Sequence, residues 1–240
     1  MEKYKIEIYE KYSETHLVGR KSNLFNDFEK YFKYYEKNYS NYLPLSRNER
    51  IIEFGCGSGK FLYYLKKKGF NNITGLDLDK NQISFANKLN ISEAKYGNFI
   101  NHLQFENGLY DRIVFLDVLE HFKKEEVIDI LSNCKKILSS SGKIIMHVPN
   151  AESLFSSKII YGDITHESAF TQTSLMQIGR LVGFKKIEIA EDKKVFFGIK
   201  GIILNILWKL VKGILNLIFY AESGKKNFIH SSNLICVYSK

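Results

Sequence analysis

From Arg50 onwards, short apolar runs alternate with longer stretches in which apolar residues recur every three or four positions. The short runs predict buried strands and the longer stretches predict amphipathic helices. Strands that alternate with helices are typical of a parallel, doubly wound sheet with helices on both faces, so the pattern predicts a seven-stranded, Rossmann-like α/β fold. Strands are expected over residues 50–55, 72–78, 94–99, 111–117, 142–149, 185–191 and 233–239, and helices over 60–68, 80–89, 124–138 and 173–182.

The first 48 residues differ from the rest because they are polar and rich in aromatic side chains. Between Lys21 and Tyr42, apolar residues at spacings of three and four predict an amphipathic helix, which Pro44 ends. We therefore divide the chain into an N-terminal helical cap, 1–48, and a main domain, 49–240, that carries a helical insert at 195–226.

The insert contains the most apolar stretch of the chain, residues 195–221. Lys200, Lys209 and Lys212 interrupt it, and each central lysine would cost ~3 kcal/mol in a membrane-spanning helix. Its polar residues form one narrow helical stripe and the other positions are nearly all apolar, so the apolar face must be covered. The sequence leaves three covers open: its own domain, a second copy in a homodimer, or the surface of a membrane. The stripe consists of Asn205, Lys209, Lys212 and Asn216.

The insert lies between the sixth and seventh predicted strands, so it follows a strand end at the edge of the sheet where ligands bind. We therefore expect it to lie beside or over the acceptor pocket, as an apolar lid or dock for a lipid-linked or membrane-bound acceptor.

Composition limits the remaining classes of protein. The chain has 240 residues and a formal net charge of +9, which suits a nucleic acid, an anionic membrane or an anionic substrate as partner. The lysines are scattered in pairs and form no basic arm.

The three cysteines form no Cys-x-x-Cys pair, so neither a disulfide framework nor a cysteine zinc site is expected. Met1 leads into EKYKIEIYEK, which lacks the apolar core of a signal peptide and predicts a cytoplasmic location.

The first predicted strand runs into a glycine loop, EFGCGSG, over residues 53–59. A Walker A loop would need glycine where Phe54 stands and serine or threonine where Phe61 stands, and a dinucleotide fingerprint would need glycine in place of Lys60. A Gly-x-Gly-x-Gly turn between strand and helix remains, and it allows a ligand to approach the backbone closely. Asp77 ends the next predicted strand, where an acid can accept both ribose hydroxyls of a nucleoside.

Four ordered motifs, IIEFGCGSGKF, TGLDLDKNQI, YDRIVFLDVLEHF and SSSGKIIMHVPN, cover roughly residues 50–190. Together they resemble the class I S-adenosylmethionine-dependent methyltransferases. The resemblance implies S-adenosyl-L-methionine as cofactor, no metal ion, a ribose site at Asp77, adenine contacts at Leu78 and at Asn98, and a segment from Leu116 that closes over the methionine end. For Glu53 and Asp117 a purely structural role, capping a helix or a backbone amide, stays open. The implied cofactor-binding residues are Glu53, Gly55, Cys56, Gly57, Gly59, Asp77, Leu78, Asn98, Phe99, Leu116 and Asp117.

Methyl transfer to a sugar hydroxyl calls for a general base, because the hydroxyl is a weak nucleophile until its proton leaves. His121 follows the fourth predicted strand, and His166 lies in the polar segment YGDITHE after the fifth, with Asp163 three residues before it. His166 is favoured slightly as base or substrate ligand; the alternative is that Thr165 and Glu167 cap the next helix and His166 has no role. His121 is either the base or a residue that orders its loop.

The stretch from VPNAES through YGDITHESAF resembles a bacterial methyltransferase subgroup associated with capsule, O-antigen and other surface-polysaccharide biosynthesis. The resemblance implies O-methylation of a sugar or glycan intermediate. Two other functions stay open: methylation of a small lipid-soluble molecule such as a quinone precursor, and a cofactor-binding scaffold without catalysis. Nucleic acid is not expected as a partner, because residues 117–120 lack the prolines of enzymes that methylate base amines.

Overall fold

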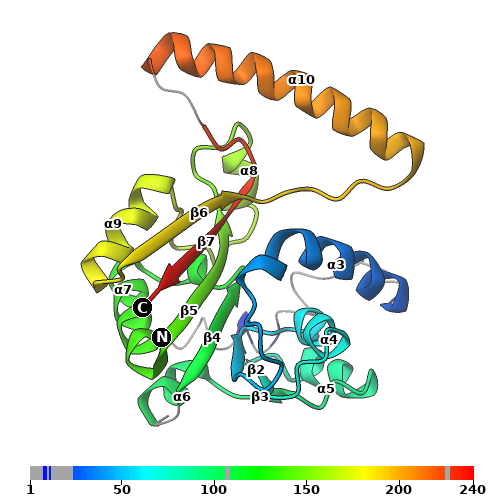
Figure 1. The fold of residues 1–240 in the computed structure, drawn as a ribbon, viewed down its shortest axis with the longest axis vertical. Helices are drawn as coiled ribbons and strands as arrows, with labels where there is room; N and C mark the ends of the chain where they lie inside the picture. Colours follow the sequence, from blue (N-terminus) through cyan, green and yellow to red (C-terminus); the bar gives the residue numbers. More distant parts are fainter. Residues whose placement is uncertain (1–7, 10, 12–23, 106–108, 225–227) are drawn as a thin grey trace.

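The computed structural model describes residues 8–9, 11, 24–105, 109–224 and 228–240. Seven strands form one sheet with the order β3-β2-β1-β4-β5-β7-β6 (Figure 1). The strands are β1 Ile51–Phe54, β2 Ile73–Asp77, β3 Ala94–Tyr96, β4 Tyr110–Leu116, β5 Leu138–Pro149, β6 Lys186–Glu191 and β7 Asn233–Ser239. The predicted α/β fold with a seven-stranded Rossmann-like sheet is confirmed.

The direction of β7 differs from the parallel sheet that the sequence pattern predicts. β7 pairs antiparallel with both β5 and β6, whereas β1 pairs parallel with β2 and β4. The insert explains this difference, because it starts at the carboxyl end of β6 and returns the chain to the same edge of the sheet. Glu191 lies opposite Leu234, so β7 must run back along β6.

Helices cover both faces of the sheet because successive strand residues point to opposite sides. Ile52 and Phe54 belong to a core with α6, α7 and α9, whereas Ile51 belongs to a second core with α3 and α4. The helices are α3 Leu24–Tyr39, α4 Lys60–Lys67, α5 Lys80–Lys88, α6 Phe99–Phe105, α7 Lys124–Ile137, α8 Ser156–Ile160, α9 Gln172–Val182 and α10 Gly198–Ser223, with short 3₁₀ turns η1 Ser40–Tyr42 and η2 Leu119–His121.

The predicted N-terminal helix is present as α3 and is followed by η1 before Pro44. Its aromatic residues explain its position: Tyr35 and Tyr39 are buried against Phe61 of α4, with ring centroids 5.1 and 5.7 Å away. α3 therefore shares a core with the sheet. Residues 1–7, 10 and 12–23 of the proposed cap lie outside the described residues, and the division at residue 48 stays a prediction.

The predicted insert forms one long helix, α10, which crosses the molecule at the carboxyl edge of the sheet and stands apart from it (Figure 1). An extended segment connects β6 to the helix. The helix thus lies at the expected edge. None of the described residues that line the candidate ligand cavity belongs to α10, so α10 does not form a direct lid over that cavity.

Candidate active site

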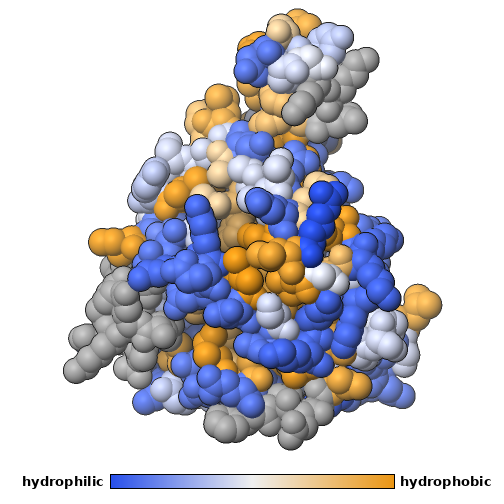
Figure 2. Space-filling view, turned by 90° about the vertical axis from the view of Figure 1, so that its left-hand side faces the viewer, coloured by the Kyte–Doolittle hydropathy of each residue, from blue (hydrophilic) through white to orange (hydrophobic). Residues whose placement is uncertain are grey.

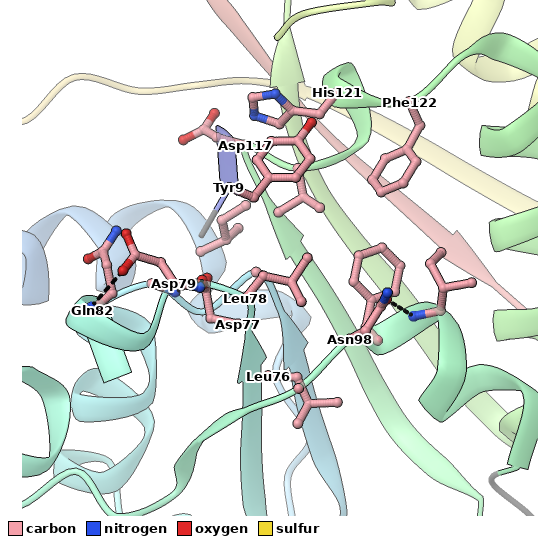
Figure 3. A pocket seen from close by; sticks show the side chains of 17 residues that line it. Tyr9, Leu76, Asp77, Leu78, Asp79, Gln82, Asn98, Asp117, His121 and Phe122 are labelled. Carbon is pink, nitrogen blue, oxygen red and sulfur yellow. Dashed lines mark hydrogen bonds between the residues drawn. The ribbon is translucent and has the colours of Figure 1, made fainter. Parts of the chain in front are cut away.

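A cavity of about 250 Å³ opens where β1, β2 and β4 end, at the edge where parallel sheets bind ligands (Figure 3). Most of the sequence-predicted residues line it: Gly55, Gly57, Asp77, Leu78, Asn98, Phe99, Leu116, Asp117 and His121. Five others lie outside the described lining: Glu53, Cys56, Gly59, Asp163 and His166.

The glycine loop holds three left-handed residues, Gly55, Gly57 and Gly59, with φ of 72°, 51° and 76°. A side chain at Gly55 would also collide with Val118, because its Cβ would lie 2.4 Å from Val118 Cγ2. The loop therefore needs glycine for its turn and for the close approach of the segment after β4. Cys56 between them is buried and contributes to the core rather than to the described cavity wall.

Asp77 fixes the glycine loop against the end of β2. Its carboxylate accepts the Gly57 N–H at 2.7 Å and the Asp79 N–H at 2.8 Å, one on each oxygen. Burial raises the pKa of Asp77 despite these hydrogen bonds. Each oxygen retains a further lone pair, so the geometry suits a carboxylate that also accepts the hydroxyls of a ribose.

Glu53 lies behind the loop and is only 3% exposed. Its Oε2 has no hydrogen-bond partner among the described residues. Burial, with the charge of Asp77 added, raises its pKa well above the usual range. A buried carboxyl oxygen without a partner can accept a hydrogen bond from a bound ligand. S-adenosylmethionine carries an ammonium group, which is such a donor. The residues present therefore fit this cofactor.

The adenine end of the expected site is formed by the start of α6. Asn98 Oδ1 accepts the Ile100 N–H at 2.9 Å, so Asn98 caps this helix (Figure 3). Its Nδ2 remains a donor, which suits a ring nitrogen of adenine better than the exocyclic amine. Phe99 is mostly a core residue, since it stacks on Phe54 at 5.0 Å and is 8% exposed.

Asp117 forms the opposite wall of the cavity in a left-handed conformation, with φ of 57°. Its Oδ1 lies 2.7 Å from Nδ1 of the buried His147, whose Nε2 lies 3.7 Å from Asp192 Oδ2. Burial alone would lower the pKa of His147, but Asp117 and Asp192 raise it to about 10. Burial would raise the pKa of Asp117, but the positive charge and hydrogen bond of His147 lower it. A charged imidazole thus holds an ionised Asp117 at the cavity.

This network reaches the N-terminal helix, because Tyr34 of α3 donates its hydroxyl proton to Asp192 Oδ1 at 2.7 Å. No sequence motif marks His147, Asp192 or Tyr34 as a site residue, and the place of His147 in the fifth predicted strand suggests only a buried structural role. They come from β5, the segment after β6, and α3, and only the fold brings them together.

His121 lines the cavity and is the end of a buried hydrogen-bond chain. Thr165 donates its hydroxyl proton to Asp163 Oδ1 at 2.6 Å, and His121 Nδ1 lies 2.8 Å from Thr165 Oγ1. Since the hydroxyl proton is committed to Asp163, we assign the imidazole proton to Nδ1, which leaves the lone pair on Nε2. Burial, and then His166, lower the pKa of His121 to about 4, so the ring is neutral at pH 7.

His166 lies next to His121, with ring centroids 4.8 Å apart, but it does not line the described cavity. Its Nδ1 lies 3.2 Å from the Ile160 carbonyl oxygen. The structure therefore brings the two candidate bases and Asp163 together, with His121 in front and the other two behind it.

Glu120, His121 and His166 place potential metal-ligand atoms within 4.8 Å of one another. Burial, and then Asp117, raise the pKa of Glu120 well above its usual range, which favours the neutral acid. Metal ligands must be deprotonated, so this arrangement is a weak metal site as it stands. A reaction without a bound metal stays a prediction.

Several cavity residues escaped the sequence analysis. Tyr9 packs edge-on against His121, with ring centroids 5.6 Å apart, and lies beside it over the cavity (Figure 3). Gln82, Val118 and Phe122 also line the wall. Gln82 lies within the motif TGLDLDKNQI, and Val118 and Phe122 lie within the segment from Leu116 that was expected over the methionine end. No sequence signal links Tyr9 to His121, which lies more than a hundred residues away.

Known proteins share both this fold and part of this sequence. Residues 28–189 match a family model described as "Methyltransferase domain". A Staphylococcus carnosus protein named "Uncharacterized methyltransferase" is 29% identical over 112 residues, which are 45% of this chain and 53% of that protein. The ubiquinone biosynthesis O-methyltransferase of Pectobacterium carotovorum is 22% identical over 107 residues, 42% of this chain and 44% of that protein.

The aligned region thus spans about half the length of the curated relatives that the chain matches. Among solved structures, a SAM-dependent methyltransferase from Archaeoglobus fulgidus has a TM-score of 0.63 at 19% identity, covering 91% of this chain and all of that one. This likeness concerns the fold. The family model covers more than half of the chain, and the glycine loop, Asp77 and all the described cavity residues except Tyr9 lie within it. The chain belongs to the methyltransferase domain family, with S-adenosylmethionine as its cofactor.

Proposed function

We propose that this protein is an S-adenosylmethionine-dependent O-methyltransferase in which His121 removes the proton of the acceptor hydroxyl. The observation that carries the proposal is the buried chain from His121 through Thr165 to Asp163, which ends at the cavity that Asp77 and Asp117 also line. When bound, the cofactor supplies an electrophilic methyl group, and the protein's task is to position the acceptor and take its proton.

The chain's own residues divide this task. We assign Asp77 to the ribose and Asp117 to the positively charged end of the cofactor. We assign Glu53 to the same end from behind the glycine loop, because its Oε2 has no partner among the described residues. His121 Nε2 accepts the proton as the oxygen–methyl bond forms. The imidazole is neutral at pH 7, so its lone pair is available for this step, but the same lowered pKa makes it a weaker base than an ordinary histidine. The position of His166 behind His121 makes it a positioning residue in this proposal, which reverses the slight preference from sequence.

The acceptor that we propose is a sugar hydroxyl of a glycan intermediate. A sugar hydroxyl needs a base more than a phenol does, and the Asp163–His166 segment resembles the surface-polysaccharide subgroup. The second candidate is a phenolic quinone precursor. It is favoured by the 22% identity to a ubiquinone biosynthesis O-methyltransferase and by the aromatic residues Tyr9 and Phe122 in the cavity wall.

Labelled-methyl transfer tests both the activity and the base. The protein would be incubated with methyl-labelled cofactor and, separately, with nucleotide sugars, a glycolipid extract and a hydroxylated quinone precursor. Label in a sugar product supports the first acceptor, label in the quinone product replaces it with the second, and no transfer to any acceptor contradicts the activity.

The histidine variants then assign the base. We expect His121→Gln to lower kcat by at least ~100-fold, the usual range for loss of a general base, while the cofactor dissociation constant stays within about twofold. His166→Gln is the matched control, and we expect it to lower kcat by less than about tenfold. Full turnover by the His121 variant would exclude this residue as the base.

A further inference from the structure

An ordinary surface helix turns its apolar face to the protein and its polar face to solvent, whereas α10 turns its polar face to the protein and its apolar face outwards. Lys212 forms an ion pair with Glu191 at the end of β6, and Asn216 Oδ1 accepts the Nε2 proton of His230 at 2.7 Å. Both partners belong to the body of the protein. Half of the polar stripe predicted from sequence is therefore tied to the protein, which fixes the rotation of the helix about its axis.

The opposite face of α10 is apolar and open. Ile199, Ile203, Ile206, Leu210, Ile214 and Leu217 follow one another at spacings of three and four and are 53–80% exposed. In Figure 2 the end of α10 projects at the top of the molecule with hydrophobic residues on it. Within the described chain α10 is long and apolar enough to cross a membrane, yet its most apolar window is not buried at all. A soluble helix normally buries such a face.

The topology of the sheet rules out a single crossing of a membrane. β6 and β7 pair residue by residue up to Glu191 and Leu234, so the chain leaves and re-enters the sheet at one point. A single crossing would place the two ends of α10 on opposite sides of the bilayer. Either 192–197 or 224–232 would then have to return through hydrocarbon without regular backbone pairing, which lipid does not tolerate. α10 is about 39 Å long, and it can contact a membrane by lying flat in the plane of the interface.

The charges around α10 complement an anionic surface. The acids before the helix face inwards, since Glu191 pairs with Lys212 and Asp192 accepts from Tyr34. Lys200 and Lys209 are exposed and flank the apolar face, and Lys193 and Lys194 are exposed at its approach. The segment 192–226 has two acidic residues against lysines at 193, 194, 200, 209, 212, 225 and 226. Of these lysines, 193, 194, 200 and 209 are exposed, whereas Lys212 neutralises Glu191 at the junction.

We propose that α10 docks the protein on the surface of an anionic phospholipid bilayer, lying in the plane of the interface with Ile206 and Leu210 towards the acyl chains. β6 is parallel to β5 and β4, so α10 stands at the sheet edge where the cavity opens. A docked molecule therefore holds this edge near the lipid headgroups. The docking stands on α10 alone and does not depend on the chemistry proposed for the cavity.

Vesicle co-sedimentation of the full chain tests this proposal, with vesicles of phosphatidylcholine alone or with 30% phosphatidylglycerol added. The wild type should bind the anionic vesicles and bind phosphatidylcholine at least tenfold more weakly. Ile206→Glu/Leu210→Glu should lower binding at least tenfold, and Lys209→Gln about fivefold, in line with one interfacial cation. Leu45→Glu is the matched control, because Leu45 is also an exposed apolar residue (97%) but lies far from α10. It is close in sequence to Tyr42, whose carbonyl accepts from Arg112 at the amino end of β4, the edge of the sheet opposite to α10.

Two further measurements keep the test independent of folding. Cofactor binding should be the same in all variants, which separates failure of docking from failure of the methyltransferase site. A Trp208→Phe background removes the single tryptophan of the chain. In this background the tryptophan fluorescence of the Leu210→Trp variant should be quenched by brominated lipid. No binding of wild type to anionic vesicles overturns the proposal. So does a stable dimer in light scattering that the double variant dissociates, because a second copy would then cover the face.

Discussion

At the scale of single residues, a buried charge decides how the cavity wall is held. His147 is fully enclosed, yet its pKa of about 10 keeps it protonated between Asp117 and Asp192. In the unfolded chain the ordinary value is 6.5. Between these values the folded protein keeps a proton that the unfolded chain has lost, so the stabilisation is complete below pH 6.5 and disappears as pH rises towards 10.

His147→Gln should remove this dependence. We expect the variant to lose about 1–2 kcal/mol of unfolding free energy at pH 6, because two carboxylates lose their cation and water screens only Asp117, whose side chain is 62% exposed. The difference from wild type should shrink steadily between pH 7 and pH 10. Urea unfolding at several pH values measures it, and a constant difference across that range would show that His147 is neutral in the folded protein.

Asp77 is the residue on which cofactor binding should depend most. Asp77→Asn keeps the shape of the side chain but replaces one acceptor of the two backbone N–H bonds with a donor. We expect the affinity for S-adenosylmethionine to fall at least ~30-fold, since a buried charge-assisted pair is worth about 2 kcal/mol or more. Calorimetry measures it, with Asp129→Asn on the exposed face of α7 as control. Equal affinities would remove Asp77 from the ribose site.

The residues that the sequence predicted best are those set by a local pattern. Asp77 and the glycine loop follow strands directly, so the end of the strand places them at the ligand edge. His147, Asp192 and Tyr34 could not be predicted in this way, since His147 and Tyr34 are 113 positions apart and meet only through sheet packing. The choice between His121 and His166 also needed the structure, because it depends on which ring faces the cavity.

At the scale of elements, the turn from β1 to α4 depends on space as well as on backbone conformation. Gly69→Ala should cost about 1–2 kcal/mol of stability because the residue is left-handed, and Gly55→Ala should cost more because its Cβ also meets Val118. A Cβ at Gly69 meets nothing within 4 Å, whereas one at Gly55 would push Val118. Only Gly55→Ala should therefore also lower cofactor affinity, by about tenfold or more. Thermal unfolding and calorimetry check the pair, and equal effects of both substitutions on affinity would contradict this reading.

The elements themselves were mostly predictable, because each core strand is a short apolar run and each helix shows its own period. The predicted strand over 233–239 matches β7, and the predicted helix over 173–182 matches α9, which Gly183 ends in a left-handed conformation. The direction of β7 was not predictable, since a strand sequence does not encode which way its neighbour runs. The short helices α6 and α8 were also missed, because they are too brief to show a clear period.

At the scale of the whole molecule, α10 should be separable from the methyltransferase fold. Replacing residues 197–226 with a short Gly-Ser turn joins strand ends that already lie opposite each other. The lost contacts are chiefly the Lys212–Glu191 ion pair, worth about 0–1 kcal/mol near the surface, and the contacts of Asn216 and Phe219. We expect the melting temperature to change by less than about 4 °C and cofactor affinity to be unchanged. Loss of folding would show that α10 supports the core.

The place of β7 in the sheet also imposes an order of events on the nascent chain. β6 has no hydrogen-bonded neighbour other than β7 in the described sheet, and β7 comes more than forty residues later. β6 and the apolar helix are therefore synthesised before the strand that holds β6 in the sheet. Until β7 pairs with β6, the apolar helix is attached to a sheet that lacks its last strand. In that interval its exposed apolar face can contact a bilayer, a chaperone or another chain.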